Sequence, residues 1–315
     1  MEIKRIGLIC CFLPVVLAIW AMSAPAKRNI SSQPVNLDEL DVYNYAKTPI
    51  EDVKQLRVVA FNIEFGSKYD VIEQYLKEQL KYPGAVVFLL SEVDRLHSRT
   101  GDRHVARDLA ETLGLNAVWG VEFAEHNDRT PETPGATGNA ILSNVPLRNA
   151  RIVRHTAMFD WKKIGRFTDE ERDGQRMSLV ADVVIGNDVV ASVVSTHLES
   201  RTDGAGRAKQ MKEIIKAIGG NPIPTIIGGD MNEQAHGALF DDIEAGGFFN
   251  AFPDNHDKTG DCIVKDNGQP SCMVKIDWIF YRGLDMTLSA VDSPMDKSGI
   301  LMSDHTPVRA EFRLK

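Results

Sequence analysis

The 315-residue chain is 43% hydrophobic and 25% charged, which is typical of a soluble globular protein, and it can hold one large domain or two small ones. Its formal net charge of −8 is opposite in sign to that of proteins that bind DNA regardless of sequence, and this argues against a simple nuclease. A cluster of carboxylates that awaits a cation would also make the net charge negative.

The N-terminal segment has the pattern of a targeting sequence. Lys4 and Arg5 precede an apolar run over residues 6–22, and Ala-Pro-Ala follows at the spacing of a cleavage site. This order predicts a signal peptide over residues 1–26 and export to the periplasm or the extracellular space. The alternative is an uncleaved membrane anchor, because the apolar run is almost long enough to span a bilayer.

The rest of the chain divides into an arm and one domain. Residues 27–54 are mixed and polar and contain Pro34 and Pro49, which predicts a linker or an arm laid on the domain. No linker interrupts residues 55–315, and we therefore expect a single domain there.

Cys262 and Cys272 are the two cysteines that follow the N-terminal segment. In an oxidising compartment we expect them to pair and close a small loop, whereas two reduced thiols are the alternative. No further cysteine or histidine stands at a spacing typical of zinc sites.

Strand and helix patterns intermix along the domain. Apolar residues at a spacing of three and four predict helices, and continuous apolar runs predict strands that are buried on both sides. In chain order we expect a strand at 56–65, a helix at 69–80, a strand at 85–93, a helix at 103–115, two strands within 176–198 that turn at 186–187, a helix at 205–220, a strand at 224–232, a helix at 237–247, and closing strands at 275–281 and 306–314. This mixture predicts an α/β fold with several antiparallel strand pairs.

Polar side chains stand at the end of nearly every predicted core strand. They are Asn62, Glu64, Glu92, His197, Asp230, Asn232, Asp277, Asp304 and His305. A charge beside a buried strand costs free energy unless it is paired or bound to a metal, and α/β folds form their clefts at strand ends. Each residue alone could be an exposed carboxylate, a cap or a structural histidine, but their recurrence favours one site. Carboxylate and amide oxygens suit Mg²⁺, Mn²⁺ or Ca²⁺ rather than zinc.

Seven segments in this order also carry a family resemblance. They are FNIEFG, LLSEVDR, GNAILSN, STHLESR, GGDMN, KIDWIF and SDHTPV, within residues 56–315. Together they resemble the endonuclease/exonuclease/phosphatase superfamily. The resemblance implies a four-layer α/β sandwich, in which two mixed β-sheets pack face to face and are flanked by helices. It also implies a metal-dependent phosphodiesterase or phosphatase that hydrolyses phosphate esters by in-line attack of water.

The resemblance implies a metal site. Glu92 falls at the principal carboxylate ligand of a Mg²⁺ ion, for which Mn²⁺ or Ca²⁺ could substitute, and Asn62 and Asp304 fall at supporting positions. Glu64 stands where several nuclease members have aspartate, which leaves its reach to the metal open.

The resemblance also implies the residues that act on the phosphate. Asp277 would orient His305, and either His305 or Asp230 would be the base, which the sequence leaves open. Asn232 and His197 would donate hydrogen bonds to the pentacovalent phosphate.

Two further residues bear on the substrate. Asn139 replaces a tyrosine that some nuclease members show nearby, which argues against duplex DNA. Arg207 lies near the start of the predicted helix at 205–220, where an arginine can point at a phosphate. A solvated arginine on an exposed helix face is the alternative.

The leading hypothesis is therefore an exported, divalent-metal-dependent phosphodiesterase of the nuclease type. The runner-up is a phosphomonoesterase or lipid phosphodiesterase acting on inositol phosphates or sphingomyelin, which suits the acidic charge and an N-terminal membrane anchor. A non-catalytic binding module ranks last, because it would require the loss of a catalytic group and none of those named above is missing. The sequence indicates no protein partner.

Overall fold

The computed structural model describes residues 36–47, 53–125, 135–162, 172–220, 222–253 and 257–314. The targeting segment at 1–26 lies outside the described residues, and its assignment to a signal peptide or an anchor stays a prediction. Among the helices of the described ranges, none has both the length and the hydropathy needed to cross a bilayer.

The larger of two mixed sheets forms around β2 and β3, which are the only parallel pair among its described strands. Its order is β1 (Leu40–Asn44), β4 (Asn116–Glu125), β5 (Gly135–Ser143), β3 (Ala85–Arg95), β2 (Gln55–Phe65), β16 (Val308–Arg313) and β15 (Asp285–Val291), with β7 (Arg172–Gly174) paired to β4. The remaining pairs are antiparallel.

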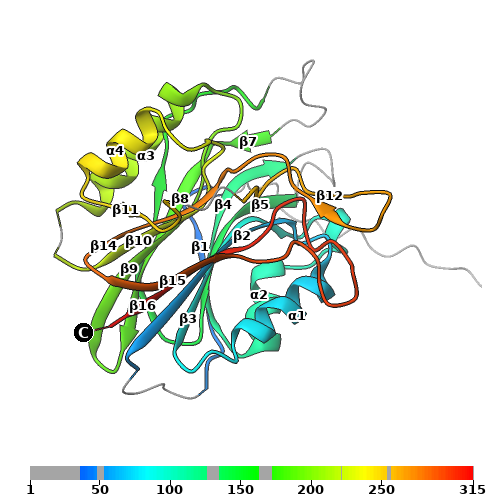
Figure 1. The fold of residues 1–315 in the computed structure, drawn as a ribbon, viewed down its shortest axis with the longest axis horizontal. Coiled ribbons are helices and arrows are strands. Elements are labelled where there is room, and N and C mark those ends of the chain that lie inside the picture. The colour runs from blue at the N-terminus through cyan, green and yellow to red at the C-terminus, as the bar shows by residue number, and fades with distance from the viewer. Residues whose placement is uncertain are drawn as a thin grey trace, which may run out of the picture. The chain divides into compact units, whose positions relative to one another are not determined.

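The second sheet also contains one parallel pair, β9 with β10. Its order within the described residues is β11 (Phe249–Asn250), β14 (Asp277–Arg282), β10 (Thr225–Asp230), β9 (Asp188–His197), β8 (Met177–Ile185) and β6 (Leu147–Arg154). A small ribbon of β12 (Ile263–Val264) and β13 (Pro270–Ser271) stands apart from both sheets. Figure 1 shows the two sheets between two groups of helices.

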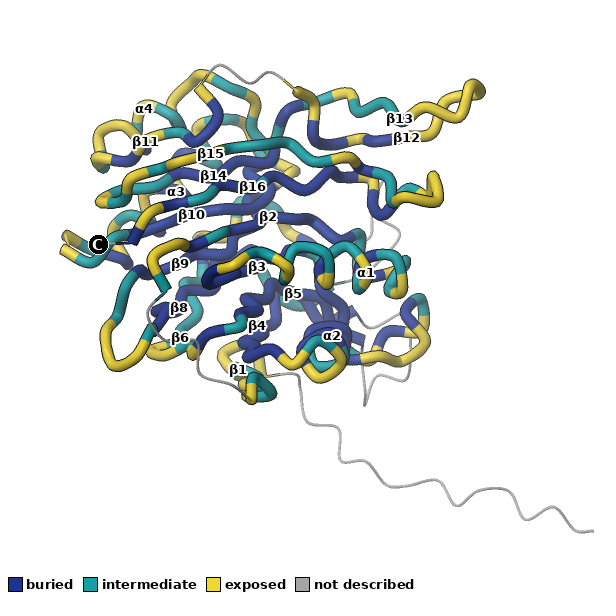
Figure 2. The backbone as a smooth tube through the Cα atoms, turned by 60° about the horizontal axis from the view of Figure 1, so that its bottom comes forward, coloured by how far each residue is buried: buried dark blue, intermediate teal, exposed yellow. Residues whose placement is uncertain are grey.

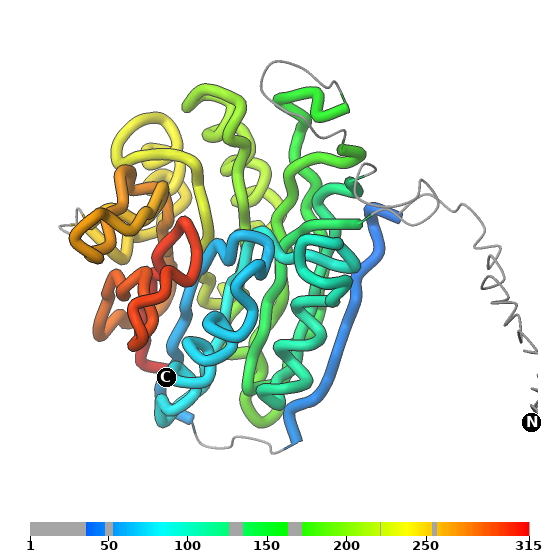
Figure 3. Tube along the Cα trace, turned by 90° about the vertical axis from the view of Figure 1, so that its right-hand side faces the viewer, coloured from blue at the N-terminus to red at the C-terminus, as the bar shows by residue number. Residues whose placement is uncertain are grey.

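The helices cover the outer faces of the sheets. They are α1 (Tyr69–Gln79), α2 (Val105–Leu113), α3 (Gly204–Ile218) and α4 (Ala238–Ala245), with a short 3₁₀ turn η1 (Ser98–Thr100). Figure 3 shows α1 and α2 side by side in front of the larger sheet, whereas α3 and α4 pack on the second sheet. The predicted α/β fold with two mixed sheets packed face to face and flanked by helices is confirmed.

Successive side chains of β2 point to opposite faces of the sheet, so the strand contributes to two hydrophobic cores. Val58 and Ala60 point into the core between the sheets, whereas Val59 and Phe61 point into the core under α1 and α2. Gly228 of β10 faces this inner core, where an added Cβ would lie 2.9 Å from the Leu89 side chain. The central strands β2, β3, β9 and β10 are largely buried, whereas the edge strands β1, β6 and β15 are partly exposed, as Figure 2 shows.

The arm contributes to the larger sheet. Residues Leu40–Asn44, within the segment that the sequence assigned to a linker or arm, form β1 and pair antiparallel with β4. This strand was not predicted from the sequence, and neither were β4, β5, β6 and β15.

A disulfide joins Cys262 to Cys272, so the predicted pairing of these cysteines is confirmed. The bridge closes the loop that contains β12 and β13. Its apolar side chains Ile263, Val264 and Met273 are exposed, and Figure 2 shows this ribbon extending from the sheets.

Candidate active site

The ends of β2 and β3 leave regular strand geometry where the polar residues begin. The β2–β3 pairing shifts register after Asn62, and the β3–β5 pairing shifts around Glu92. Glu92 has a φ of +52° and Glu64 a φ of +47°, left-handed conformations that are uncommon for residues with a side chain. Such conformations persist where the surrounding structure holds them, and they concentrate at functional sites.

The second sheet brings three polar residues together by strand pairing. Parallel β9 places His197 beside Asp230, and antiparallel β14 places Asp277 on the other side of Asp230. Gly229 precedes this aspartate with a φ of +144°, and a Cβ there would collide with the carbonyl oxygen of Thr196. Glycine is therefore required at this position by both conformation and space.

Asp230 is the point where side chains of both sheets meet. Its Oδ2 atom accepts a hydrogen bond of 3.2 Å from Asn62 Nδ2 of β2. The Nε2 atoms of His197 and His305 lie 3.4 Å and 3.6 Å from Asp230 Oδ2. The other ring nitrogen of His305, Nδ1, lies 2.9 Å from Asp277 Oδ2. Two histidines, an amide and a second acid thus surround one buried carboxylate.

Burial changes the charge states of this group. Burial raises the pKa of Asp230 to about 7, although the positive charge of His305 partly offsets the rise. Burial alone would lower the pKa of His305, but the carboxylates of Asp277 and Asp230 outweigh it and raise that pKa well above its usual range. Burial lowers the pKa of His197 well below its usual range. At neutral pH, His305 is therefore charged and His197 is neutral.

Asn232 and His197 have donor atoms beside this carboxylate. Asn232, at a φ of +49°, donates its backbone N–H to Asp230 Oδ1 at 2.8 Å and its Nδ2 to the carbonyl oxygen of Leu198 at 2.9 Å. An amide NH₂ has two hydrogens, and one remains for a ligand. The Nδ1 atom of His197 is buried and has no hydrogen-bond partner among the described residues.

Glu92, Asn62 and Asp304 offer the oxygen atoms that a divalent cation needs. Burial raises the pKa of the Glu92 carboxyl, and the negative charge of Asp304 contributes to the rise. Two mutually repelling carboxylates with an amide fit a hard cation, which binds oxygen and removes the repulsion. Glu64 differs, because its Oε2 lies 3.3 Å from Lys68 Nζ. The described contacts tie the Glu64 carboxylate to this lysine rather than to the other ligands.

A second group could also hold a metal ion. The ligand atoms of Asp230, Asp277 and His305, all buried, lie within 4.8 Å of one another. The family resemblance implied that these three residues act on the phosphate rather than bind a metal. Since His305 already pairs with the two acids, a cation there would have to displace the imidazole, which favours the group around Glu92 as the cation site.

Arg176, which the sequence analysis missed, is a buried cation beside the site. It directly precedes β8, and the pairing of β8 with β9 brings it to the end of β9 that carries His197. Its Nη1 donates to Glu122 Oε2 at 3.1 Å, and its charge offsets part of the rise that burial causes in the pKa of Glu92. The hairpin predicted at 176–198 carried a signal for this residue. Residues equally far from a two-residue turn face each other, which places Arg176 opposite the end of the strand that carries His197. The Nε atom of Arg176 has no partner among the described residues.

The two predicted substrate-binding residues make contacts within the protein. Buried Asn139 donates its Nδ2 to the carbonyl oxygen of Met177 at 2.9 Å. Arg207 donates its Nε to Glu233 Oε2 at 2.9 Å and its Nη1 to the carbonyl oxygen of Thr202 at 2.7 Å. Only 12% of the Arg207 side chain is exposed, so the alternative of a solvated arginine is wrong.

A buried chain of hydrogen bonds lies behind His197. His155 Nε2 is 2.8 Å from Ser178 Oγ, which is 2.7 Å from the Oγ1 of Thr196, the residue before His197. The other ring nitrogen of His155 is 3.2 Å from Glu213 Oε2 of α3. The chain links the helix layer to β8 and β9.

We expect Glu213→Gln to destabilise the fold at neutral pH. Burial alone would raise the pKa of Glu213, but hydrogen bonds from His155 and Thr156 outweigh it and lower the pKa to about 2. A depressed pKa contributes stability above the unfolded value of about 4.3, and this is lost as the pH falls through the folded pKa. After allowance for partial exposure, we expect a loss of about 1–2 kcal/mol at pH 7.

Urea unfolding at pH 7 and at pH 3.5 measures this effect. The difference between wild type and variant should be smaller at pH 3.5. Glu244→Gln, an exposed glutamate of α4, is the control and should change neither value. An equal loss for Glu213→Gln at both pH values would contradict the assignment.

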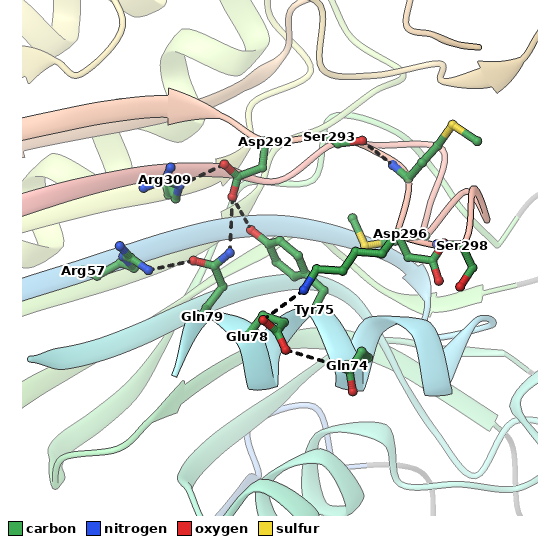
Figure 4. A pocket seen from close by; sticks show the side chains of 13 residues that line it. Arg57, Gln74, Tyr75, Glu78, Gln79, Asp292, Ser293, Asp296, Ser298 and Arg309 are labelled. Atoms are coloured by element: carbon green, nitrogen blue, oxygen red, sulfur yellow. Dashed lines mark hydrogen bonds and ion pairs between the residues drawn. The ribbon is translucent and has the colours of Figure 1, made fainter. Parts of the chain in front are cut away.

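A cavity of about 570 Å³ lies elsewhere, between α1 and the loop after β15 (Figure 4). Its polar side chains already pair with one another: Tyr75 donates to Asp292 at 2.8 Å, and Asp292 accepts from Arg309 at 2.9 Å. The residues around Asp230 do not line this cavity. We therefore place the chemistry at the strand ends.

The sequence from residue 59 to residue 305 matches the Endonuclease/Exonuclease/phosphatase family. The chain belongs to this family. The recognition made from the seven motifs is thus confirmed. No protein of the curated set matches the chain.

Solved structures of the family share the fold at low identity. A member from Beutenbergia cavernae DSM 12333 has a TM-score of 0.58 and 17% identity, over 83% of this chain and 72% of its own. The human nocturnin catalytic domain with a bound sulfate anion has a TM-score of 0.57 and 18% identity, over 88% of this chain and 98% of its own. A family protein from Leptotrichia buccalis C-1013-b has a TM-score of 0.56 and 17% identity, over 82% of this chain and 99% of its own. At these identities the likeness shows the fold alone.

Family membership defines the class of reaction. Enzymes of the endonuclease/exonuclease/phosphatase family are hydrolases that act on phosphoester bonds and depend on divalent metal ions. The protein is therefore a phosphoester hydrolase, and the buried acidic group at the strand ends is consistent with metal dependence.

Proposed function

We propose that the protein is a phosphodiesterase, nuclease-like in its chemistry, that hydrolyses its substrate by in-line attack of water. The observation that carries this proposal is convergence on one carboxylate. Side chains from distant segments and from both sheets surround Asp230; they are Asn62, His197, Asp277 and His305. A structural role alone gives no reason to bury two acids and two histidines together.

In this proposal Asp230 is the base and His305 the cation beside it. With a pKa of about 7, the Asp230 carboxylate can take a proton from water near neutral pH. His305, held by Asp277 and charged, would stabilise negative charge that develops on the phosphate. The pKa values therefore favour Asp230 where the sequence left the base open.

The phosphoryl oxygens would be held by neutral donors and one cation. His197 has a buried Nδ1 that lies 3.9 Å from Glu92 Oε1 and makes no hydrogen bond within the described residues, and Asn232 has a second amide hydrogen. Arg176 adds a buried positive charge at the same end of the sheet. Donors that are already oriented stabilise the transition state without reorganisation.

Glu92, Asn62 and Asp304 would hold the metal ion. A divalent cation there would neutralise charge on the phosphoryl oxygens or the leaving group. We propose Mg²⁺ or Mn²⁺, because the ligand set is oxygen only.

The charge of the site supports a diester as the substrate. A phosphodiester carries one negative charge, whereas a monoester carries between about 1.5 and 2 at pH 7. With a divalent ion bound, the positive charges of that ion, His305 and Arg176 balance the acids around Asp230, and no excess positive charge is left for the second charge of a monoester. Phospholipids are the second candidate, because the ribbon beside the site exposes Ile263, Val264 and Met273.

Export is proposed from the N-terminal pattern. The Cys262–Cys272 disulfide supports it, because disulfides persist mainly in oxidising compartments.

We expect treatment with a chelator to abolish hydrolysis of bis-p-nitrophenyl phosphate and added Mg²⁺ or Mn²⁺ to restore it. Zn²⁺ should restore little activity, because the proposed ligands Glu92, Asn62 and Asp304 offer only oxygen atoms, which suit Mg²⁺ or Mn²⁺ better. The measurement is the release of p-nitrophenol after chelation, dialysis and addition of each metal ion. Recovery with Zn²⁺ alone would contradict the oxygen-ligand assignment.

Glu92→Gln is the matched variant for this experiment. It keeps the size of the side chain and removes the ligand charge, so that more Mg²⁺ should be needed for half-maximal activity.

Parallel assays with p-nitrophenyl phosphate, single-stranded DNA, RNA, and sphingomyelin or phosphoinositide vesicles identify the substrate class. Turnover of the monoester alone would overturn the diesterase proposal.

A further inference from the structure

One buried threonine joins the two segments that carry the paired acid and histidine. Thr259 has no exposed surface, and its Oγ1 accepts the backbone N–H groups of Ile276 at 3.1 Å and Asp277 at 3.0 Å. Its carbonyl oxygen accepts the backbone N–H of Thr306, next to His305, at 2.7 Å. Thr259 therefore contacts the residue that carries the carboxylate and the neighbour of the residue that carries the imidazole.

This link matters because the pair spans the two sheets. Asp277 begins β14 of the second sheet, whereas His305 lies three residues before β16 of the larger sheet. No ladder of strand hydrogen bonds connects β14 with β16, since they belong to different sheets. The distance of 2.9 Å between Asp277 Oδ2 and His305 Nδ1 thus depends on contacts outside the sheets.

The carboxylate of Asp277 is also held on one side only. Its Oδ2 contacts His305, but its buried Oδ1 has no hydrogen-bond partner among the described residues. The position of the Asp277 backbone must then determine where the carboxylate points. That backbone is held by the pairing of β14 with β10 at Asp230 and, on the side of Thr259, by the two hydrogen bonds to its Oγ1.

The residues after Thr259 extend the contact to the histidine. A Cβ on Gly260 would lie 3.3 Å from His305 Cε1 and 2.7 Å from Ile276 Cδ1, so the glycine backbone packs beneath the imidazole. The backbone N–H of Cys262 donates to the carbonyl oxygen of Asp304 at 2.8 Å. Gly260 and Cys262 therefore contact the turn that carries His305, while Thr259 holds the backbone of Asp277.

We infer that Thr259 is a positioning residue for the reaction: its hydroxyl holds the Asp277 backbone so that the carboxylate meets His305. The inference rests on the proposed function, in which this pair acts on the phosphate. Thr259 itself touches no substrate. Small displacements of catalytic groups lower rates steeply, so loss of the hydroxyl should appear in turnover rather than in binding.

The test compares Thr259→Val with Thr259→Ser. Valine keeps the shape and the backbone carbonyl but removes the acceptor for two N–H groups, whereas serine keeps the hydroxyl. With bis-p-nitrophenyl phosphate and Mg²⁺, we expect Thr259→Val to lower kcat by about 10- to 100-fold with KM within about twofold. Thr259→Ser should stay within about threefold of wild type in kcat.

Two comparisons separate positioning from a general loss of structure. Thr225→Val removes another buried threonine hydroxyl, at the end of β10 remote from Asp230, and should leave kcat unchanged. In an Asp277→Asn background, Thr259→Val should lower log kcat by less than about half of the decrease it causes in the wild type. The reason is that the contact of residue 277 with His305, which Thr259 supports, is already altered. Additive losses would show that Thr259 does not act through Asp277.

The outcomes for the inference and for the proposed function are distinct. An active wild type with a folded, fully active Thr259→Val overturns the inference alone, whereas a wild type that hydrolyses no diester overturns the proposed function. Thermal unfolding establishes that each variant is folded. If Thr259→Val does not fold, Thr259→Ala is the substitute, and wild-type kcat in that variant would overturn the inference. The amide hydrogen of Asp277 should exchange faster in the Val or Ala variant, even if no turnover is measured. Unchanged exchange would contradict the role of the Thr259 hydroxyl in holding the Asp277 backbone.

Discussion

Asp230→Asn is expected to lower kcat for diester hydrolysis by about 10³-fold or more. The substitution keeps the size of the side chain but removes the carboxylate that accepts a proton from water. General-base catalysis contributes about 10²- to 10⁴-fold, and the loss of negative charge also removes the partner of the His305 cation. The measurement is steady-state hydrolysis of bis-p-nitrophenyl phosphate at saturating Mg²⁺. Full activity would remove Asp230 from the mechanism.

The same variant should remain folded. Burial raises the pKa of Asp230 to about 7, so the ionised carboxylate costs stability as the pH rises through that value, and asparagine removes this cost. Against this, the new amide places an N–H donor against Asn62 Nδ2 or the backbone N–H of Asn232. Because the effects oppose, we expect the free energy of unfolding at pH 8 to change by less than about 2 kcal/mol. Asp285→Asn, an exposed aspartate of β15, is the control.

His305→Ala is expected to lower kcat by about 10²- to 10³-fold, and unlike the aspartate substitution it should also destabilise the protein. His305 lies between Asp277 and Asp230, at 2.9 Å and 3.6 Å. Its removal leaves two buried carboxylates without their cation, and breaking a buried pair in this way costs about 3–5 kcal/mol.

Two measurements separate the catalytic loss from the structural loss. His104→Ala removes another buried histidine, whose Nε2 lies 2.8 Å from Asp41, and it should lower stability while kcat is unchanged. Imidazole added to His305→Ala should restore part of the rate by occupying the space of the missing ring. A His305→Ala variant that is folded and fully active would contradict the proposed role.

The strands that the sequence predicted are those whose own residues account for their burial. β2, β3, β9 and β10 are continuous apolar runs, and apolar side chains on both faces require cover on both sides. β15 was missed because it is a half-exposed edge strand without a periodic apolar face. β4 is wholly buried but contains Glu122 and Glu125. Arg176 pairs with Glu122, whereas His97, Arg99 and Arg172 pair with Glu125, and these partners from other segments allow the carboxylates to be buried.

The site divides in the same way. The types and order of the polar strand ends predicted Asp230, Asp277 and His305, which the structure brings together. Arg207 could not be assigned from the sequence, because Glu233 lies 26 residues further along the chain and becomes its partner only in the folded protein. Arg176 could be found only through the hairpin that pairs β8 with β9, and its buried environment consists of residues from other segments.

The sequence by itself determined the family, the class of fold and the kinds of side chain that stand at the strand ends. These follow from local properties, because apolar periodicity and residue chemistry are carried by short stretches of chain. Only the tertiary structure decided which polar atoms meet, that Glu64 pairs with Lys68, and that Thr259 connects the strand carrying Asp277 with the turn carrying His305. Such contacts depend on the packing of two sheets against each other, and their distances and charges are set by neighbours that lie far away in the chain.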